Sequence, residues 1–382
     1  MKIRTITYFA TFYKFNETVE KEIERAGAFL KRAKQKFIDN GIEVQDIRLA
    51  TNSWTEYMVG HELEVLPRMF RLLETMALKA GFSCVSAGPA NTYHDILSIP
   101  EYIRATEITF FSTHLGSRAT GIDIDSCRAT ASAIQWISQQ TANGFGNFRF
   151  CALASPKAGI PFFPAGFSDS RTSFAVGLES SDLLTKTAKD EIEKYESNLE
   201  KILEVELKKI ENICSEIEKE NGIPFEGIDA SIVPSLAPDE SVMKIFSHFG
   251  IDTIGSPASI YLVSAITKTI KNLKIKKCGF SGLMLPVMED AGLAKLAEAG
   301  KLRLSDLLIC SALCGTGLDT IPLPGDISDA SLYRILLDVA TISVRLDKPL
   351  TARLLPVPGK KKGEMTEFTS EFVINTAIIN NA

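Results

Sequence analysis

The sequence predicts an α/β protein built as a closed β/α barrel of about ten strands, and three observations lead to this fold class. The chain has 382 residues, 45% hydrophobic and 23% charged, which is typical of a folded globular protein. Short β-branched runs alternate with long helical patterns, which favours parallel strands joined by right-handed crossovers. The number of runs approaches the limit of an open twisted sheet, and no strongly polar edge strand is evident, so closure is favoured.

The first half of the chain shows the alternation most clearly. The pattern predicts a strand over residues 3–8, a helix over 17–40, a strand over 43–49 and a helix over 60–80. Further strands are predicted over 108–112, 149–153, 174–178 and 228–233, with a helix over 126–140. Later strands are predicted over 253–254, 279–285, 307–309, 340–344 and 351–355.

A long polar stretch over residues 181–220 interrupts this alternation. It is rich in Glu and Lys and carries apolar residues along one face, so we expect one helix or a helical pair. Such a helix would cross the outside of the barrel or pack against a partner subunit. We expect a single domain over residues 1–382, with this helical excursion and a peripheral C-terminal segment over 359–382.

Charge and hydropathy exclude several classes of protein. The net charge is −5 and the basic residues are dispersed, so the sequence lacks the basic patch of a nucleic-acid-binding protein. No apolar stretch reaches the roughly 18–20 residues that span a bilayer, and the first residues predict a strand instead of a signal peptide. We therefore expect a cytoplasmic protein. The seven cysteines lie mostly in apolar or helical contexts, where structural disulfides are not expected.

The loop over residues 112–123 joins a predicted strand to a predicted helix and carries several groups suited to anion binding. His114 is a candidate catalytic residue of this loop, and the candidate ligand-binding residues are Gly116, Ser117, Arg118 and Asp123. Free backbone N–H groups before a helix attract anions. The alternative is a turn capped by Asp123. The loop matches neither the Walker nor the Rossmann nucleotide-binding pattern.

The four histidines are far apart in sequence and lack the spacing of zinc ligands. The sequence does not exclude a cation bound by oxygen atoms, such as Mg²⁺. Ser281 is flanked by glycines, but the G-x-S-x-G spacing of a nucleophile elbow is absent, so we keep it as a ligand-binding candidate. Glu289 and Asp290 follow a predicted strand. They would either cap the next helix or supply a carboxylate for acid–base chemistry.

Residues 315–326 follow another predicted strand end, where barrels carry their sites. Asp319 and Asp326, held by Pro and Gly, are the strongest single candidates in the sequence, against ordinary turn chemistry as the alternative. Arg353 is a candidate partner for a carboxylate or phosphate. The apolar, proline-braced loop over residues 161–169 would either fill the barrel interior or wall a pocket.

Several phrases of the sequence resemble an uncharacterised prokaryotic family, the domain of unknown function 711 family. They are residues 279–282, 317–326, 353–361 and 363–368, with the opening residues 3–7 and the Gly116-Ser117 loop. The resemblance implies a ten-stranded barrel similar to that of pyruvate formate-lyase and other glycyl-radical enzymes, in a homo-oligomer. It implies no established activity. A radical mechanism would need a C-terminal loop that carries the radical glycine, and residues 371–382 contain no glycine, which argues against glycyl-radical chemistry.

These observations favour a barrel that binds a small anionic metabolite, with no nucleic-acid, membrane, haem or nucleotide partner. Its mouth would be formed by residues 114–123, Glu289-Asp290 and residues 319–326, with Arg353 as an anion partner. Whether the protein is an enzyme, using carboxylates or a divalent cation, is left open. The alternative is a non-catalytic oligomeric scaffold or ligand-sensing regulator, in which the same loops are structural.

Overall fold

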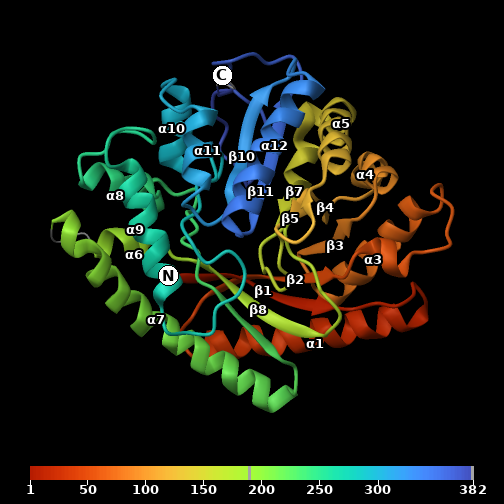
Figure 1. Ribbon diagram of the computed structural model, residues 1–382. Coiled ribbons are helices and arrows are strands. Elements are labelled where there is room, and N and C mark those ends of the chain that lie inside the picture. The colour runs from red at the N-terminus through yellow and green to blue at the C-terminus, as the bar shows by residue number, and fades with distance from the viewer. Residues whose placement is uncertain (188–190, 380–382) are drawn as a thin grey trace.

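The computed structural model describes residues 1–187 and 191–379, and it shows a mixed α/β fold in which helices surround a large central sheet (Figure 1). The large sheet contains β1 (Lys2–Ala10), β2 (Val44–Thr51), β3 (Cys84–Ala90), β4 (Thr109–His114), β7 (Phe150–Ala154), β8 (Ser173–Glu179), β9 (Phe225–Asp229), β10 (Gly317–Pro324) and β11 (Leu350–Val357). A separate two-stranded ladder consists of β5 (Gly116–Ser117) and β6 (Gly121–Ile122).

The helices fall into groups along the chain. The first half contains α1 (Glu17–Asp39), α2 (Trp54–Tyr57), α3 (Leu66–Ala80), α4 (Tyr93–Ala105), α5 (Ile124–Gln140) and the 3₁₀ segment Ala142–Arg149. The second half contains α6 (Asp182–Lys186), α7 (Ile192–Asn221), the 3₁₀ turn Pro238–Glu240, α8 (Met243–His248), α9 (Ser259–Asn272), α10 (Ala291–Glu298), α11 (Leu304–Ser311) and α12 (Asp329–Leu346).

The nine strands of the large sheet run in two opposed sets. Their order is β10-β11-β7-β4-β3-β2-β1-β8-β9. Strands β1, β2, β3, β4 and β7 are mutually parallel, and so are the pairs β8–β9 and β10–β11. The antiparallel pairings, β1 with β8 and β7 with β11, are the two seams between the sets. The predicted alternation of parallel strands and helices is therefore confirmed in the first half of the chain.

The segment over residues 276–286 lies between the two edge strands of this order. Parallel bridges pair Ile228 with Lys277 and Ile232 with Leu283 on the β9 side, and Pro286 with Asp319 of β10 on the other side. The backbone N–H of Val287 also donates to the carbonyl of Asp319 at 3.1 Å. The predicted strand over 279–285 is thus present only as isolated bridges, because β9 and β10 each contact a different part of the segment.

Three predicted strands are wrong. Residues 253–254 lie in the turn between α8 and α9, residues 307–309 lie within α11, and residues 340–344 lie within α12. A short apolar run fits a buried strand and a buried helix equally well, and here the helical spacing of neighbouring apolar residues decides. The sequence pattern also missed β3, α4 and β10, and the helix predicted from residue 60 begins at residue 66.

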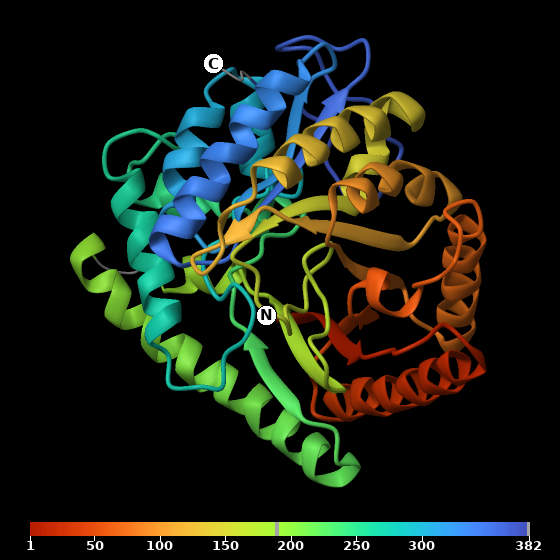
Figure 2. The ribbon, with the colours of Figure 1, turned by 45° about the vertical axis from the view of Figure 1, so that its right-hand side comes forward.

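The predicted helical pair over residues 181–220 is confirmed as α6 and α7, with residues 188–190 outside the described part of the chain. The buried residues of α7 recur every three or four positions, as in Leu199, Leu203 and Leu207. This face packs against α9, β9 and α1 of the same chain. Figure 2 shows α7 as a long helix on the outside of the molecule, beside α1.

Candidate functional site

A cavity of about 420 Å³ opens inside the curve of the sheet, between the β1–β2 side and the β10–β11 side. We call it the arginine cavity. Its charged lining residues are Arg4, Asp46, Arg48, Glu289, Asp319, Arg353 and Glu371. Its aromatic lining residues are Phe110, Phe148, Phe162, Phe163, Phe280 and Phe372. Apolar walls with a few convergent polar groups are typical of small-molecule sites.

Arg353 of β11 is the central cation of the cavity. Its Nε donates to Asp319 Oδ1 at 2.7 Å and its Nη2 donates to Glu289 Oε1 at 2.6 Å. The guanidinium carbon lies 4.8 Å from the ring centroid of Phe148, within cation–π range. Burial opposes the charged form of Arg353, but Asp319 and Glu289 outweigh it and raise the pKa of the guanidinium. Arg353 is therefore a fixed cation at every physiological pH.

A bulge in β10 explains why Asp319 points to Arg353. Leu318 pairs with Ala352 and Ile321 pairs with Leu354, so two β10 residues, Asp319 and Thr320, face the single β11 residue Arg353. Thr320 takes a φ of 46°, in the left-handed region that a β-branched residue rarely adopts. A bulge of this kind turns a side chain out of the regular alternation. The bulge therefore brings a carboxylate into the cavity beside Arg353.

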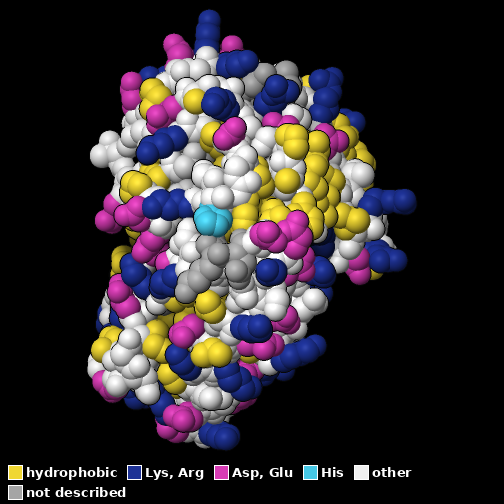
Figure 3. Space-filling view, turned by 90° about the vertical axis from the view of Figure 1, so that its left-hand side faces the viewer, with side chains coloured by type: hydrophobic (Ala, Val, Ile, Leu, Met, Phe, Trp, Pro, Cys, Tyr) yellow, Lys and Arg dark blue, Asp and Glu magenta, His cyan; other side chains and the backbone are white. Residues whose placement is uncertain are grey.

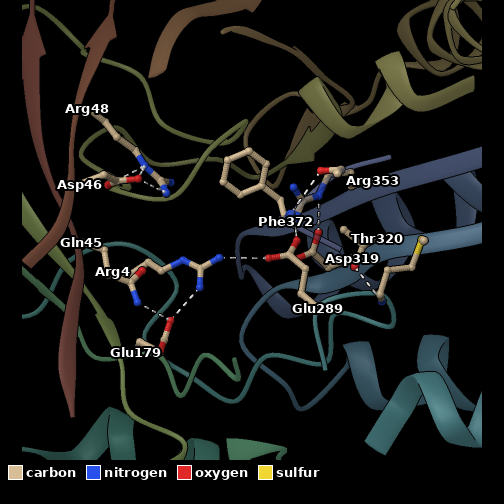
Figure 4. Close-up of polar contacts among 12 residues, drawn as sticks. Arg4, Gln45, Asp46, Arg48, Glu179, Glu289, Asp319, Thr320, Arg353 and Phe372 are labelled. Atoms are coloured by element: carbon tan, nitrogen blue, oxygen red, sulfur yellow. Dashed lines mark hydrogen bonds and ion pairs between the residues drawn. The ribbon is translucent and has the colours of Figure 1, made fainter. Parts of the chain in front are cut away.

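The ion pairs continue across the cavity to the opposite side of the sheet. Glu289 Oε2 lies 3.5 Å from Nη2 of Arg4, and Nη1 of Arg4 donates to Glu179 Oε2 at 2.7 Å. Gln45 also donates to Glu179 Oε2, at 3.0 Å. Figure 4 shows Glu289 between Arg4 and Arg353. One carboxylate thus links β1 to β11.

Arg4 and Arg48 reach the cavity from neighbouring strands. In β1, Arg4 is the extra residue of a bulge, because Ile3 pairs with Leu178 and Thr5 pairs with Gly177 of β8. In β2, Arg48 lies on the same face as Asp46 and binds that carboxylate through Nε and Nη2 at 2.9–3.1 Å. Its guanidinium carbon lies 5.5 Å from the Phe163 ring centroid.

Two thiols also line the cavity, Cys84 of β3 and Cys151 of β7. Burial raises the pKa of both groups, although the nearby Arg48 partly offsets it for Cys84 and Arg353 partly offsets it for Cys151. A protonated thiol is a weak nucleophile and a weak metal ligand. The chemistry that this arrangement supports is therefore carboxylate and guanidinium chemistry.

The loop over residues 161–169 both fills the interior and walls the cavity. Thr7 of β1 donates to the carbonyl of Pro161 at 2.9 Å, and the ring of Phe162 packs against Gly177 of β8, where a Cβ would meet it at 2.8 Å. Phe163 and Pro164 continue this loop as cavity lining. Both interpretations drawn from the sequence apply to the same loop.

The structure brings three of the candidate residues together and separates Glu289 from its neighbour. Glu289, Asp319 and Arg353 form one hydrogen-bonded group in the arginine cavity. Asp290 is buried outside it and caps α10, accepting from the backbone N–H groups of Gly292 and Leu293 at 2.8 Å. The two sequence interpretations of the pair thus apply to different residues.

Ser281 lies in the bridging segment and makes structural hydrogen bonds. Its Oγ donates to the carbonyl of Cys278 at 2.8 Å and accepts from the N–H of Ala230 at 3.2 Å. The fully buried Asp229 accepts from the backbone N–H groups of Phe280 and Ser281 at 2.8 and 2.9 Å. Asp229, which sequence reasoning missed, holds this segment against β9.

The remaining candidates lie away from the arginine cavity. Gly116 and Ser117 form β5, and the exposed Arg118 lies 3.8 Å from the exposed Asp347. Asp123 accepts from the N–H and the hydroxyl of Ser126 and caps α5. Asp326 is exposed in the turn after β10. His114 lines a different pocket.

Sequence reasoning did not single out Arg4, Arg48 or Glu179 as site residues. The signal was available for Arg4 and Arg48, which are charged residues inside the predicted strands 3–8 and 43–49, whereas Glu179 directly follows the predicted strand 174–178. A charged side chain in an interior strand needs a partner or a ligand. Within residues 1–187 and 191–379, no group of three or more His, Cys, Asp or Glu side chains is arranged to hold a metal ion.

The opposed strand sets and the paired charges of the cavity define an α/β protein with a ligand-sized cavity. The chain belongs to the family described as Uncharacterised ACR (DUF711), whose model matches residues 1–371. The family resemblance seen in the sequence is therefore confirmed.

Relatives of the chain come from archaea and bacteria. It is 26% identical to a UPF0210 protein of Pyrobaculum islandicum over 385 residues, covering 93% of this chain and 82% of that protein. It is 31% identical to UPF0210 protein PAE3581 of Pyrobaculum aerophilum over 66% of this chain and 57% of that protein. It is 30% identical to UPF0210 protein NMA1908 of Neisseria meningitidis over 75% of this chain and 67% of that protein.

Along residues 1–187 and 191–379, every helix is too short or too polar to cross a membrane.

Proposed function

We propose that the arginine cavity binds a small anionic metabolite. The observation that carries this proposal is the convergence of Arg4, Arg48 and Arg353 in one aromatic-walled cavity of about 420 Å³. A guanidinium has five N–H donors in a rigid fork that matches carboxylate and phosphate geometry. Three such groups in one cavity are suited to a ligand that carries at least one of these anions.

The carboxylates hold the guanidinium groups in place without using all of their donors. Asp46 accepts hydrogen bonds from Nε and Nη2 of Arg48. Arg353 likewise donates through Nε and Nη2, to Asp319 and Glu289. The third nitrogen, Nη1, of Arg48 and of Arg353 donates no hydrogen bond within residues 1–187 and 191–379, and it is the donor that we assign to the ligand. Because the side chains are already fixed by ion pairs and aromatic contacts, ligand binding costs little ordering of the protein.

Glu289 and Asp319 are the groups that we propose for acid–base chemistry on such a ligand. Each accepts a hydrogen bond from Arg353 and lines the cavity, so each carboxylate is held in a fixed position within reach of a bound ligand. A divalent cation such as Mg²⁺ would be bound by these carboxylates together with oxygen atoms of the ligand. Proteins commonly bind Mg²⁺ in this way when the ligand carries a phosphate.

We propose further that the sheet closes into a barrel through residues 276–286. The isolated bridges on both sides of this segment support closure, and the two opposed strand sets support the similarity to the pyruvate formate-lyase barrel. The remaining proposals are a single domain over residues 1–382, a cytoplasmic location, a homo-oligomeric state and no nucleic-acid or membrane partner. The net charge of −5 and the dispersed basic residues support the proposal that no nucleic acid is bound.

Thermal shift assays test the binding proposal directly. The protein would be titrated with inorganic phosphate, citrate and a panel of phosphorylated and carboxylated metabolites, with and without Mg²⁺. A ligand at about 100 times its Kd adds roughly 2.7 kcal/mol to the free energy of unfolding, which is readily seen as a rise in Tm. We expect at least one anion to raise the Tm of the wild-type protein.

Two variants separate a functional from a structural role. Asp319→Asn removes a cavity charge while it keeps the size of the side chain, and it should abolish the response. Asp326→Asn makes the same change at an exposed residue in the turn after β10 and should respond like the wild type. A flat response of the wild type across the whole panel would favour the scaffold or regulator alternative over the binding proposal.

A further inference from the structure

A second pocket, of about 350 Å³, lies where four parallel strands end. Its lining includes Thr11, the residue after β1, Asn52, the residue after β2, and Asn91, the residue after β3. His114, the last residue of β4, completes the row. We call it the His114 pocket. The carboxyl ends of neighbouring parallel strands are where α/β folds commonly bind ligands.

The imidazole of His114 is poised for a partner that the described residues do not supply. Its Nε2 atom is buried and has no hydrogen-bond partner within residues 1–187 and 191–379. The ring packs against Phe167, with ring centroids 5.7 Å apart. Burial lowers the pKa of His114 to about 4, so the ring is neutral near pH 7. A buried polar atom without a partner is uncommon in folded proteins and costs stability unless a ligand or water serves it.

The amide donors of the pocket are already occupied. Asn52 Oδ1 accepts from the N–H of Phe12 at 2.8 Å, and its Nδ2 donates to the carbonyl of Phe12 and to Glu56. Asn91 Nδ2 donates to Ser53 Oγ and Thr55 Oγ1, both at 3.1 Å. The carbonyl oxygen of Asn91, the Oε1 atom of Glu56 and the carboxylate of Asp169 accept no hydrogen bond within residues 1–187 and 191–379 and are left as acceptors. The pocket therefore favours a ligand that donates hydrogen bonds.

The charge of the pocket points in the same direction. Glu56 and Asp169 contribute two carboxylates, and none of the described lining residues is a lysine or an arginine. Phe12, Tyr13 and Phe167 supply aromatic rings, whose faces attract cations. A phosphate or carboxylate ligand would meet only negative charge here, in contrast to the arginine cavity.

We propose that the His114 pocket is a second binding site, for a small organic cation such as a primary amine. The ammonium group would donate to the carboxylates of Glu56 and Asp169 and to the amide oxygen of Asn91. A further N–H group of the ligand would donate to Nε2 of His114, and the aromatic rings would line the space around the carbon chain. This site is independent of the anion site proposed for the arginine cavity, because the two linings share no residue.

Isothermal titration calorimetry of the full-length protein with putrescine and agmatine tests this proposal, with glucose and inorganic phosphate as comparison probes. We expect the amines to bind at low ionic strength and the two comparison probes not to compete for the same site. The double variant Glu56→Gln, Asp169→Asn should weaken amine binding at least tenfold. Glu64→Gln, an exposed residue outside the pocket lining, is the matched control and should bind like the wild type.

A second readout keeps a folding defect from being mistaken for loss of the site. Circular dichroism and the Tm of each variant in the absence of amine should match those of the wild type, since Glu56 and Asp169 are exposed. Folded variants that bind putrescine as tightly as the wild type would overturn the proposal. So would a wild-type protein that binds neither amine at millimolar concentration, or one that binds glucose or phosphate in this pocket instead.

Discussion

The arginine cavity and the His114 pocket hold their polar groups in different ways. In the arginine cavity, ion pairs connect side chains of the two opposed strand sets, with Glu289 joining Arg4 of β1 to Arg353 of β11. In the His114 pocket, residues just beyond one parallel set are tied to the nearby backbone, as Asn52 is to Phe12. The first arrangement neutralises charge across the interior, whereas the second leaves two carboxylates without a basic residue in the lining.

This difference shows how a sheet with two opposed strand sets can bring arginine and carboxylate side chains together in its interior. Arg4 and Arg353 each pair with two carboxylates that come from different segments of the chain. The antiparallel seam between β1 and β8 brings Arg4 beside Glu179.

Figure 3 shows, on the side of the molecule that lies at the left in Figure 1, hydrophobic side chains gathered in a broad area bordered by charged ones.

The largest expected effect comes from removing the shared cation of the arginine cavity. Arg353→Met keeps much of the apolar stem but leaves Glu289 and Asp319 buried without their common partner. Breaking a buried pair in this way typically costs about 3–5 kcal/mol of the free energy of unfolding. Urea denaturation followed by circular dichroism would measure it.

Arg118→Ala is the control for that experiment. Arg118 and Asp347 are 69% and 57% exposed and lie 3.8 Å apart, so their pair should contribute less than about 1 kcal/mol. If Arg353→Met were no more destabilising than Arg118→Ala, the cavity ion pairs would not be the interaction that joins the two strand sets.

The next effect distinguishes the adjacent carboxylates Glu289, which lines the cavity, and Asp290, which lies outside it. Asp290→Ala removes the acceptor for Ser241 Oγ at 2.6 Å and the backbone N–H of Val242 at 2.7 Å, as well as the cap of α10. We expect a loss of about 3 kcal/mol, because buried donors would be left unpaired and the helix uncapped. Glu289→Gln keeps an acceptor for Arg353 and should cost less, while it alters the anion response of the cavity. Equal losses in stability and equal ligand responses would contradict this division of roles.

The fold could be predicted from sequence where strands and helices are regular. The alternation in the first half gave β1, α1, β2, β4 and β7 because each apolar run is bounded by turns or helices of clear periodicity. In the second half, Ala340, Ile342 and Val344 alternate with Thr341 and Ser343, which predicts a strand, although residues 340–344 lie within α12. Strand β10 was missed because it carries two prolines and a bulge, which the pattern assigned to turn chemistry.

The site could be predicted in part. Glu289, Asp319 and Arg353 were each singled out from local sequence, but their convergence depends on a bulge and on strand neighbours that are far apart in the chain. Arg4 and Glu179 meet through an antiparallel seam that no local pattern encodes. Conversely, the local sequence of the 112–123 loop predicts an anion site, but the structure gives its residues other roles. Gly116 and Ser117 form a small hairpin, and Asp123 caps a helix.

A smaller effect, on pH dependence, concerns the His114 pocket. Burial lowers the pKa of His114 to about 4, below the ordinary value near 6.5. Between these two values the unfolded chain binds a proton at this residue and the folded protein does not, so stability falls as the pH falls through this window. We expect His114 to account for about 2 kcal/mol of lost stability between pH 7 and pH 5.

Comparison of the wild type with His114→Gln isolates this contribution, because all other titrating groups are shared. Urea unfolding at pH 7 and pH 5 should show a smaller loss for the variant than for the wild type. An equal loss in both proteins would mean that the imidazole is protonated in the folded state at pH 5, and hence that it has a partner for its charge.

The smallest effect is expected at Asp326, which the sequence ranked beside Asp319. The two residues flank most of β10, and a strand of eight residues spans roughly 20 Å or more. Asp326 is exposed beyond the end of the strand, whereas Asp319 is held by Arg353 inside the arginine cavity. Asp326→Ala should therefore change the free energy of unfolding by less than about 0.5 kcal/mol and leave the response to anions intact. A loss of the anion response in this variant, measured beside Asp319→Asn, would move the ligand site to the far end of β10 and break the distinction between the two regions.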